Sequence, residues 1–498
     1  MRFRLNRVRR GLFLDSVMLM RVSRLVAKLP GVQEAALMMG TPANQKILDN
    51  ADLLASEGIE AVGGDLIVAI RADNETAATT AMEQATLLLA NPALSSGTIG
   101  AIQPRTLRNA LRSNPKANIA LISVPGDFAS AEARKALRAG LHVMIFSNNV
   151  PLEEEISIKL EAKERGLLVM GPDCGTALLG GTALAFGNRV PAGDIGIIGA
   201  SGTGIQEVAC LIAQAGAGIS HAIGVGGRDL SDQVGGISTL TALDWLEVDP
   251  KTHHILVISK PPSPTVVERI LARLSHSKKS ATVCFLGAQR VVVQSNIVSV
   301  RTLRAAAASA LGRKESVFNR FDLVRPLTGK QKWIRGLFSG GSLAAEAQVI
   351  LLDQGLEVAS NAPIYGAHAL HGTFPCHILL DLGDDQYTRG RPHPMIDPAV
   401  RDAPLLEALQ DKEVGVVLLD IVIGYGSGEN PAAHVARVLK SQGDCDPVVI
   451  ASVTGTENDP QVLSHQVATL RAAGVWVVPS NAHAAEAASA CVAAKNGY

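Results

Sequence analysis

Residues 196–204 read GIIGASGTG, and this stretch decides the fold of the chain. An apolar run that begins at Asp194 leads into it, and Ile205, Val208 and Ile212 follow at the spacing of one helix face. The pattern predicts a strand, a glycine turn and a helix, a geometry whose backbone N–H groups and helix dipole attract an anion. The residues expected to bind a phosphate, acyl phosphate or carboxylate there are Gly199, Ser201, Gly202, Thr203 and Gly204.

The spacing of these glycines differs from two familiar nucleotide motifs. It lacks the Gly-Lys-Ser/Thr of a P-loop, and it reads GxxGxG rather than the GxGxxG of a dinucleotide fold. Asp229 lies at about the distance where a dinucleotide fold carries its ribose-binding acid, which alone is a weak indication. A tight turn whose glycines serve packing only is the alternative interpretation. Anion binding is favoured because Ser and Thr lie between the glycines.

The composition indicates a multidomain α/β protein. The 498 residues suffice for three or four domains, and 47% hydrophobic with 3% aromatic residues predicts the aliphatic cores of parallel sheets. A net charge of zero gives no reason to expect nucleic acid or a membrane surface as a partner. The sequence offers no bilayer-crossing run and no signal peptide. Six cysteines without CxxC spacing predict a reduced, cytoplasmic protein with no disulfide framework and no cysteine-ligated metal site.

Changes of pattern along the chain predict four domains and a linker. Residues 1–95 indicate a small ferredoxin-like α+β module, for which an oligomerisation or lid role without chemistry is the simpler interpretation. Residues 96–190, 191–312 and 333–498 alternate strands and helices, which is typical of open parallel sheets. The polar stretch 313–332 is interpreted as the linker before the last domain.

Glycine turns recur at other expected strand ends, which is where open α/β sheets bind ligands. The further residues expected to bind the anion are Gly226, Gly227 and Arg228 after one strand, and Gly340, Gly341 and Ser342 before a later helix. A surface salt bridge is the alternative role for Arg228. Cys174 also follows a strand, but a small residue at a tight turn is favoured over a nucleophile there.

The loop DDQYTRGRPHPMIDP, residues 384–398, is the best candidate for catalysis. His393 lies between two prolines, which stiffen the backbone. Arg391 could bind a phosphate or carboxylate, and Asp397 could orient or charge the imidazole for acid–base work. Asp384 and Asp385 could raise the pKa of His393 or bind a metal. A structural loop held rigid by its prolines is the alternative.

Several motifs together resemble the FdrA family of acyl-CoA-synthetase-like proteins. They are MGTPAN (39–44), GLLVMGPDCGT (166–176), GASGTGIQE (199–207), GGRDLS (226–231), SKPP (259–262) and GRPHPMIDP (390–398). Residues 100–310 also resemble the succinyl-CoA synthetase α subunit, and residues 334–495 resemble the ligase domain of its β subunit. The resemblance implies a Rossmann-like CoA-binding-type domain at 96–190 and two flavodoxin-like CoA-ligase-type domains at 191–312 and 333–498.

The same resemblance implies partners and a further set of contacts. CoA becomes a possible cofactor, and a second protein subunit becomes an expected partner. The residues around the implied CoA or substrate pocket are Pro125, Ser147, Asn148, Asn149 and Thr176.

Three departures from the synthetase change the expected chemistry. Its phosphorylated histidine follows the strand equivalent to 281–285, where this chain has no histidine, and Lys260-Pro261-Pro262 replaces the acid that supports it. An ATP-grasp domain is also missing. An anion site without a phosphoenzyme suits attack on an acyl or carbamoyl phosphate.

The family then implies an oxamate carbamoyltransferase subunit, which converts oxamate and carbamoyl phosphate to oxalurate and phosphate. In it His393 would be the acid or base, while Arg228 and Arg391 would hold the charge. The alternatives are an ADP-forming acyl-CoA synthetase subunit and a non-catalytic CoA- or nucleotide-binding scaffold.

Overall fold

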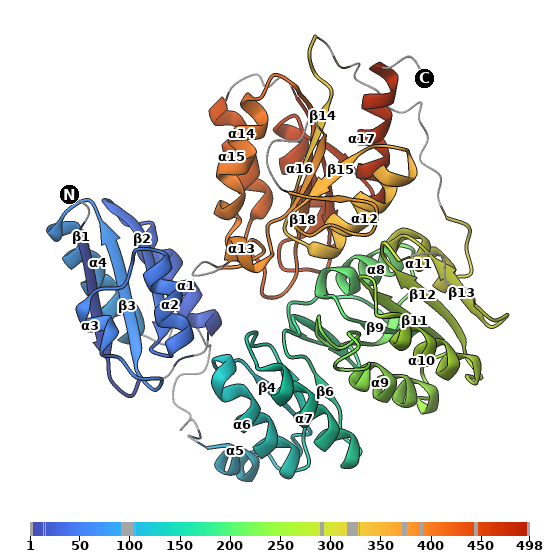
Figure 1. The fold of residues 1–498 in the computed structure, drawn as a ribbon, viewed down its shortest axis with the longest axis horizontal. Coiled ribbons are helices and arrows are strands. Elements are labelled where there is room, and N and C mark those ends of the chain that lie inside the picture. The colour runs from blue at the N-terminus through green and yellow to red at the C-terminus, as the bar shows by residue number, and fades with distance from the viewer. Residues whose placement is uncertain are drawn as a thin grey trace. The chain divides into compact units, whose positions relative to one another are not determined.

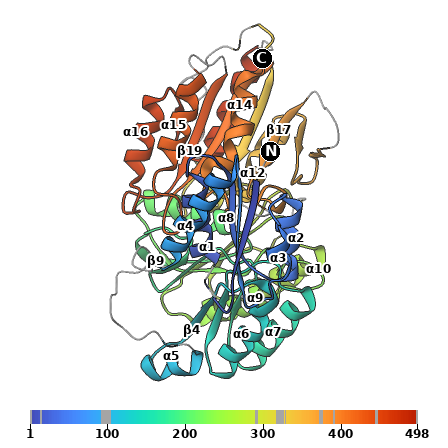
Figure 2. The same ribbon diagram turned by 90° about the vertical axis from the view of Figure 1, so that its left-hand side faces the viewer.

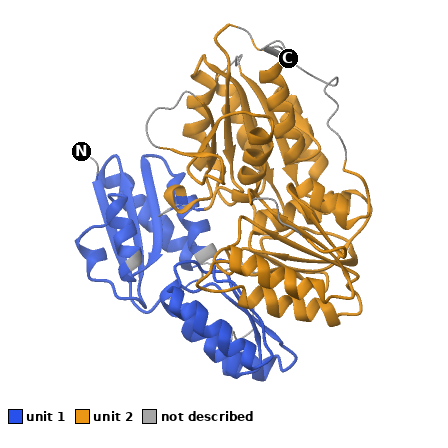
Figure 3. Cartoon of the chain, turned by 45° about the vertical axis from the view of Figure 1, so that its right-hand side comes forward, with its two compact units in different colours: residues 1–173, 388–392 blue, residues 174–387, 393–498 orange. Residues whose placement is uncertain are grey.

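The structure is a computed structural model. It describes residues 3–12, 14, 16–90, 104, 106–288, 293–315, 327, 329–370, 376–388, 392–442 and 447–495. The chain separates into two compact units (Figure 3), each described by itself below. Unit 1 comprises residues 1–173 and 388–392, and unit 2 comprises residues 174–387 and 393–498. Most of the predicted linker, 313–332, lies outside the described residues.

The first part of unit 1 is a three-stranded antiparallel sheet with helices packed against it (Figure 1). Its elements are β1 (Phe3–Arg9), α1 (Ser16–Ala27), β2 (Val32–Met39), α2 (Pro42–Asn50), α3 (Ser56–Ile59), β3 (Leu66–Ala72) and α4 (Glu75–Ala90). β3 is the central strand, in the order β1-β3-β2, and Val68 and Ile70 pack with Met82 of α4 in one core. Thr41 caps α2 by accepting a hydrogen bond from the N–H of Asn44. The predicted ferredoxin-like module is confirmed.

The second part of unit 1 is a small parallel sheet. Its elements are α5 (Leu107–Ser113), β4 (Ile119–Ile122), α6 (Gly126–Arg138), β5 (His142–Ile145), α7 (Leu152–Glu164) and β6 (Val169–Met170). Parallel neighbours need crossover connections, and α6 and α7 supply them in the order β4-β5-β6. Ala129 and Ala133 bring α6 close to the sheet because their side chains are small.

Unit 2 begins with a seven-stranded sheet in the order β13-β12-β11-β9-β10-β7-β8. Its strands are β7 (Thr176–Leu179), β8 (Thr182–Ala185), β9 (Ala192–Gly199), β10 (Ile219–Gly224), β11 (His254–Ser259), β12 (Ser280–Phe285) and β13 (Ile297–Val300). Its helices are α8 (Gly202–Gln214), α9 (Ile237–Val248), α10 (Pro264–Ser275) and α11 (Leu303–Ala310). Strands β9 to β13 are parallel, so the residues that follow β9, β10 and β11 lie at one edge of the sheet.

The hairpin of β7 and β8 pairs antiparallel with β10, although the sequence pattern groups residues 176–185 with the preceding domain. Gly180 and Gly181 connect its strands, both with positive φ (57° and 87°). Two such residues form the tight turn that joins antiparallel strands. The domain boundaries themselves stay predictions.

The second sheet of unit 2 is fully parallel, in the order β16-β15-β17-β14-β18-β19-β20. Its strands are β14 (Trp333–Phe338), β15 (Val358–Ser360), β16 (His368–Ala369), β17 (His377–Asp381), β18 (Val414–Val422), β19 (Val448–Thr454) and β20 (Trp476–Val478). Its helices are α12 (Gly341–Asp353), α13 (Asp385–Thr388), η3 (Pro398–Arg401), α14 (Asp402–Gln410), α15 (Pro431–Gln442), α16 (Leu463–Ala472) and α17 (Asn481–Lys495).

Two helix layers cover this second sheet. Helix α12 packs with α17, and α15 packs between α14 and α16 (Figure 2). All nine residues of β18 are buried, as expected for a central parallel strand. One hydrophobic core continues between the two sheets, because α8 packs against α12. The predicted α/β class with parallel sheets is confirmed.

Candidate functional site

The first glycine turn has the predicted geometry of strand, turn and helix. β9 ends at Gly199, and Ser201 caps α8 by accepting a hydrogen bond from the N–H of Gly204 at 3.2 Å. A side chain at Gly199 would lie 2.5 Å from Ile205, and one at Gly202 would lie 2.9 Å from Oγ1 of Thr176. Packing alone therefore requires two of the glycines, in line with the alternative interpretation, and anion binding there stays a prediction.

The second glycine turn is held by a buried ion pair. Asp420 of β18 accepts hydrogen bonds from the N–H groups of Ser339 (2.7 Å) and Gly340 (2.8 Å). Arg401 donates to the Asp420 carboxylate and to the Ser339 hydroxyl, both at 2.5 Å. Both charged side chains are almost fully buried. Burial lowers the pKa of Arg401, and Asp420 opposes this shift. The sequence reasoning assigned no role to either residue, although an Asp inside the apolar strand 416–422 was a usable signal.

The two turns meet. The Ser342 hydroxyl donates a hydrogen bond to the Ser201 hydroxyl at 2.5 Å, so the N-termini of α8 and α12 lie together. A side chain at Gly340 would lie 2.9 Å from Oγ1 of Thr203. Each helix N-terminus carries about half a positive charge, so two of them side by side repel each other unless an anion lies between them. The arrangement suits a phosphate or carboxylate.

A lysine and an aspartate from different sheets lie beside the N-terminus of α12. Lys260 directly follows β11, and its Nζ lies 3.5 Å from Oδ2 of Asp381, the last residue of β17. A side chain on Gly341 would overlap the Asp381 carboxylate and lie 2.8 Å from Nζ of Lys260. Burial raises the pKa of Asp381, while Lys260 and the N–H of Gly383 act against that shift. The pair therefore lies directly against the first residue of α12.

His393 is a buried imidazole whose Nδ1 is a hydrogen-bond acceptor. Its Nδ1 accepts the N–H of Met395 at 3.2 Å, so the ring proton belongs on Nε2. Burial lowers the pKa of His393 to about 4, so the expectation that Asp384 and Asp385 raise it is wrong. Nε2 lies against Gly383, where a side chain would come within 2.7 Å of it. The Phe186 ring lies 6.3 Å from the imidazole.

Asp397 and Arg391 are the other two predicted catalytic residues of this loop. Asp397 accepts a hydrogen bond from the N–H of Ala399 at 3.3 Å, and its own N–H donates to the carbonyl of His393 at 3.0 Å. Asp397 thus caps the short helix η3, and its catalytic role stays a prediction. Arg391 lies outside the described residues.

The predicted anion contacts Gly226, Gly227 and Arg228 follow β10, beside the first glycine turn. The N–H of Val225 donates to the carbonyl of Gly199 at 2.9 Å, and Arg228 is exposed. Asp229 is buried and accepts hydrogen bonds from Ser238 and Thr239 at the start of α9. Asp229 therefore caps the start of α9. This role explains why the carboxylate is buried, and it requires no bound ribose.

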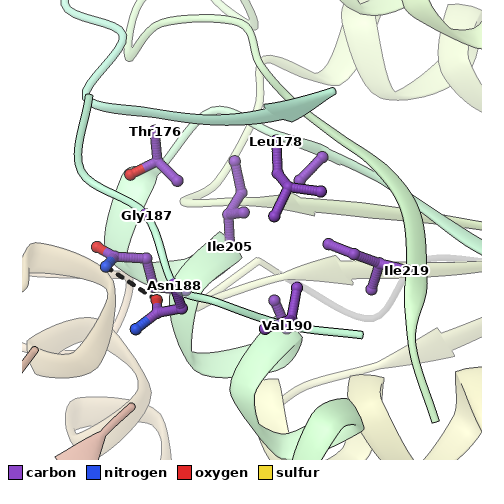
Figure 4. Close-up of a pocket in the computed structure, with 10 residues that line it drawn as sticks. Thr176, Leu178, Gly187, Asn188, Val190, Ile205 and Ile219 are labelled. Carbon is purple, nitrogen blue, oxygen red and sulfur yellow. Dashed lines mark hydrogen bonds between the residues drawn. The ribbon is translucent and has the colours of Figure 1, made fainter. Parts of the chain in front are cut away.

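The residues predicted around CoA belong to both units. Pro125 and residues 147–149 follow β4 and β5 in unit 1, where the Ser147 hydroxyl donates to the Val124 carbonyl. Thr176 belongs to unit 2 and lines a small pocket with Leu178, Ile205 and other aliphatic side chains (Figure 4). In this pocket the Gln206 amide donates to Asn188 at 3.0 Å.

The pocket in Figure 4 does not fit the phosphates of CoA, because none of its lining residues is basic. Cys174 is buried, and its thiol donates weakly to the carbonyls of Thr176 and Gly224. This supports a small residue at a tight turn rather than a nucleophile. Within the described ranges, no three His, Cys, Asp or Glu side chains gather as a metal site would require. No described helix combines the length and apolar character needed to cross a membrane.

Comparison with known protein families gives three matches, each to a different part of the chain. They are "AllF, heavy metal-associated domain" for residues 1–103, "CoA binding domain" for 191–286 and "CoA-ligase" for 337–491. Residues 1–103 contain no cysteine, so the first match brings no thiolate metal ligand with it.

The chain is also similar to individual proteins. The YahF protein of Escherichia coli (strain K12) is 40% identical over 494 residues, which cover 94% of this chain and 95% of that one. The mitochondrial succinate–CoA ligase [ADP-forming] subunit alpha-2 of Trichomonas vaginalis is 32% identical over 149 residues, 29% of this chain and 47% of that protein. This chain thus spans about half the length of that ligase subunit. The apo dinucleotide-forming acetyl-coenzyme A synthetase 1 of Ca. Korarchaeum cryptofilum gives a TM-score of 0.35 at 17% identity, covering 82% of this chain and 89% of that one.

Proposed function

Because this chain belongs to the family of the YahF protein, and carries an AllF-type N-terminal domain before CoA-binding and CoA-ligase domains, we propose that it is a subunit of an enzyme that transfers an acyl or carbamoyl group from phosphate. The reaction we favour is that of an FdrA-type oxamate carbamoyltransferase. The observation that carries the proposal is the hydrogen bond between Ser201 and Ser342, which brings two helix N-termini to one point.

In this reaction the amide nitrogen of oxamate attacks the carbamoyl carbon of carbamoyl phosphate. A C–N bond forms, the C–O bond to phosphate breaks, and the proton released by the nitrogen ends on the phosphate. Negative charge thus concentrates on the leaving phosphate. Helix N-termini and hydroxyl donors stabilise such charge when they are fixed beforehand. Ser201, Thr203 and Ser342 are the donors we assign to the phosphate oxygens.

His393 contributes as a donor. Its ring is neutral at pH 7, because its pKa lies at about 4, and Nε2 carries the proton. A neutral Nε2–H can polarise a carbonyl or bind a phosphate oxygen without adding charge. We assign His393 this acid-like role, and we assign Arg228 and Arg391 the further charge clamps. No step of the proposed reaction uses CoA, although CoA remains a possible ligand.

An ADP-forming acyl-CoA synthetase subunit is the second candidate. The CoA-ligase match over residues 337–491 and the similarity to a succinate–CoA ligase subunit favour it. That reaction would need a partner subunit that binds ATP. Its marks would be CoA-dependent ADP formation and an acid-labile phosphohistidine, with His393 as the position to examine first.

Ligand-dependent thermal unfolding of the purified chain, alone and with its partner subunit, separates these functions. Carbamoyl phosphate or phosphate at 100 times its dissociation constant should stabilise the protein by about 2.7 kcal/mol. The double variant S201A/S342A should lose this stabilisation, while Ser275→Ala, at the exposed end of α10, should keep it. Stabilisation by CoA or acyl-CoA without any by carbamoyl phosphate would contradict the transferase and favour the synthetase.

A further inference from the structure

The ion pair of Lys260 and Asp381 joins the two sheets of unit 2 beside the proposed phosphate site. Lys260 follows β11 in the first sheet, and Asp381 ends β17 in the second. Their charged atoms are 3.5 Å apart, against the Gly341 backbone at the start of α12. Gly341 precedes Ser342, whose hydroxyl contacts Ser201. The pair and the two helix N-termini therefore belong to one place.

Asp381 is the fixed member of the pair. Its backbone N–H donates to the Asn361 side chain at 2.8 Å, and its carbonyl accepts from the same side chain at 2.9 Å. Its Oδ1 accepts the N–H of Gly383 at 3.1 Å. Only 7% of the Asp381 side chain is exposed, so this carboxylate has little freedom to move.

Lys260 is the adaptable member. Its side chain is 46% exposed, and 3.5 Å is long for a charge-assisted hydrogen bond. An ammonium group has three donors, so it can hold Asp381 with one and bind an anion with the others. A flexible ammonium on an exposed stem also reaches a ligand without displacing buried groups.

We propose that Lys260 is the cation that binds the phosphate group of the substrate, and that Asp381 is the positioning residue that holds its ammonium over the N-terminus of α12. This inference rests on the proposed function. It also gives a reason for the lysine in SKPP: a cation there binds a phosphate directly, whereas an acid there would repel it. The substrate class is then a free acyl or carbamoyl phosphate.

Binding and kinetics of four variants of the full chain with its partner subunit test this assignment. The probes are inorganic phosphate and carbamoyl phosphate, measured by titration calorimetry, followed by steady-state turnover. Lys260→Met should weaken both ligands by about tenfold or more, as expected for loss of a charge-assisted contact. Lys260→Arg should restore most of the affinity. Lys251→Met should bind like the wild type, because the exposed Lys251 precedes β11 at the opposite edge of the sheet.

Asp381→Asn separates positioning from simple charge. Without the carboxylate, Lys260 keeps its charge but loses its anchor. We therefore expect phosphate affinity to stay equal or increase while kcat falls about tenfold, a split that a merely structural role for Asp381 would not produce. Circular dichroism confirms that each variant is folded.

The outcomes are distinguishable. Wild-type protein that binds neither phosphate nor carbamoyl phosphate contradicts the proposed function and this inference together. Wild-type protein that binds both, with Lys260→Met binding as well as Lys251→Met, overturns the role of Lys260 and leaves the proposed function standing. Equal losses of kcat and of phosphate affinity in Asp381→Asn overturn the positioning role.

Discussion

The Ser342 hydroxyl donates to the Ser201 hydroxyl across 141 residues of sequence, and two helices begin where these side chains touch. Ser201 also caps α8 through the N–H of Gly204. One hydroxyl therefore orders a helix end and a contact between two sheets. This dual use makes the pair a sensitive place to test the candidate site.

Replacing the two serines singly and together should reveal their coupling. Ser201→Ala removes a helix cap and should lower the free energy of unfolding by about 1 kcal/mol. Ser342→Ala removes one hydrogen bond and should cost less. Because the two residues touch, the double variant should cost less than the sum, with a coupling of about 0.5 kcal/mol or more. Urea unfolding of the four proteins measures this, and strict additivity would show that the contact adds nothing to stability.

Gly341→Ala should weaken phosphate binding more than it weakens the fold. Its methyl group would overlap the Asp381 carboxylate and lie 2.8 Å from Nζ of Lys260, so it displaces the Lys260 ammonium from the N-terminus of α12. Alanine is favoured in helices by about 0.5–1 kcal/mol over glycine, which offsets part of the strain. Calorimetry with inorganic phosphate should therefore show a loss of several fold. Gly64→Ala is the matched control, since no atom lies within 4 Å of a side chain added there; equal phosphate affinities in the two variants would contradict this prediction.

His393 should make the protein less stable in acid. Its folded pKa of about 4 lies below the ordinary histidine pKa of 6.5, so the unfolded chain binds a proton that the folded chain does not between these pH values. Stability from His393 is thus present above pH 6.5 and is lost as the pH falls toward 4. The full shift corresponds to about 3 kcal/mol, and the partial exposure of the ring reduces this to about 1–2 kcal/mol.

His393→Asn isolates this contribution, because an Asn side chain can still accept the N–H of Met395 but does not titrate. Urea unfolding at pH 7.5 and pH 5 should show a smaller acid loss for the variant than for the wild type. His377, whose pKa is also lowered to about 4, is present in both proteins and does not affect the difference. Identical slopes would mean that His393 is hydrated enough to titrate normally.

The local parts of this site follow from the sequence, and their assembly does not. Strand, glycine and helix are encoded within a few residues, so both glycine turns could be predicted separately. The contact of Ser201 with Ser342, and of Lys260 with Asp381, depends on how two sheets pack, which no short-range pattern records. His393 was found from its prolines, but its pKa direction depends on burial and was predicted with the wrong sign.

Short and buried features were also missed for physical reasons. β15 has three residues and β16 has two, too few for a recognisable alternation of polar and apolar side chains. The buried acids Glu207 and Glu346 lie on α8 and α12, two helices whose residues are mostly buried, so no polar face marks either acid. Their shared partner Asn481 comes from the last helix of the chain.

Arg401 should prove as important to the site as any residue that touches a ligand. It is the buried partner of Asp420, which in turn holds the N–H groups of Ser339 and Gly340. Arg401→Met leaves a buried carboxylate without its counter-charge and should cost about 3–5 kcal/mol of unfolding free energy. The second glycine turn should loosen with it, so phosphate affinity should fall in protein that remains folded.

Arg273→Met provides the comparison for that variant. Arg273 pairs with Asp244 at 2.6 Å, but the Asp244 side chain is 61% exposed, so its loss should cost less than about 1 kcal/mol. Both variants are measured by urea unfolding and by phosphate calorimetry at a temperature where each is folded. A small cost for Arg401→Met would mean that water reaches Asp420 once the guanidinium is gone. The turn would then be fixed by its backbone hydrogen bonds to the carboxylate alone, and phosphate affinity should stay at the wild-type value.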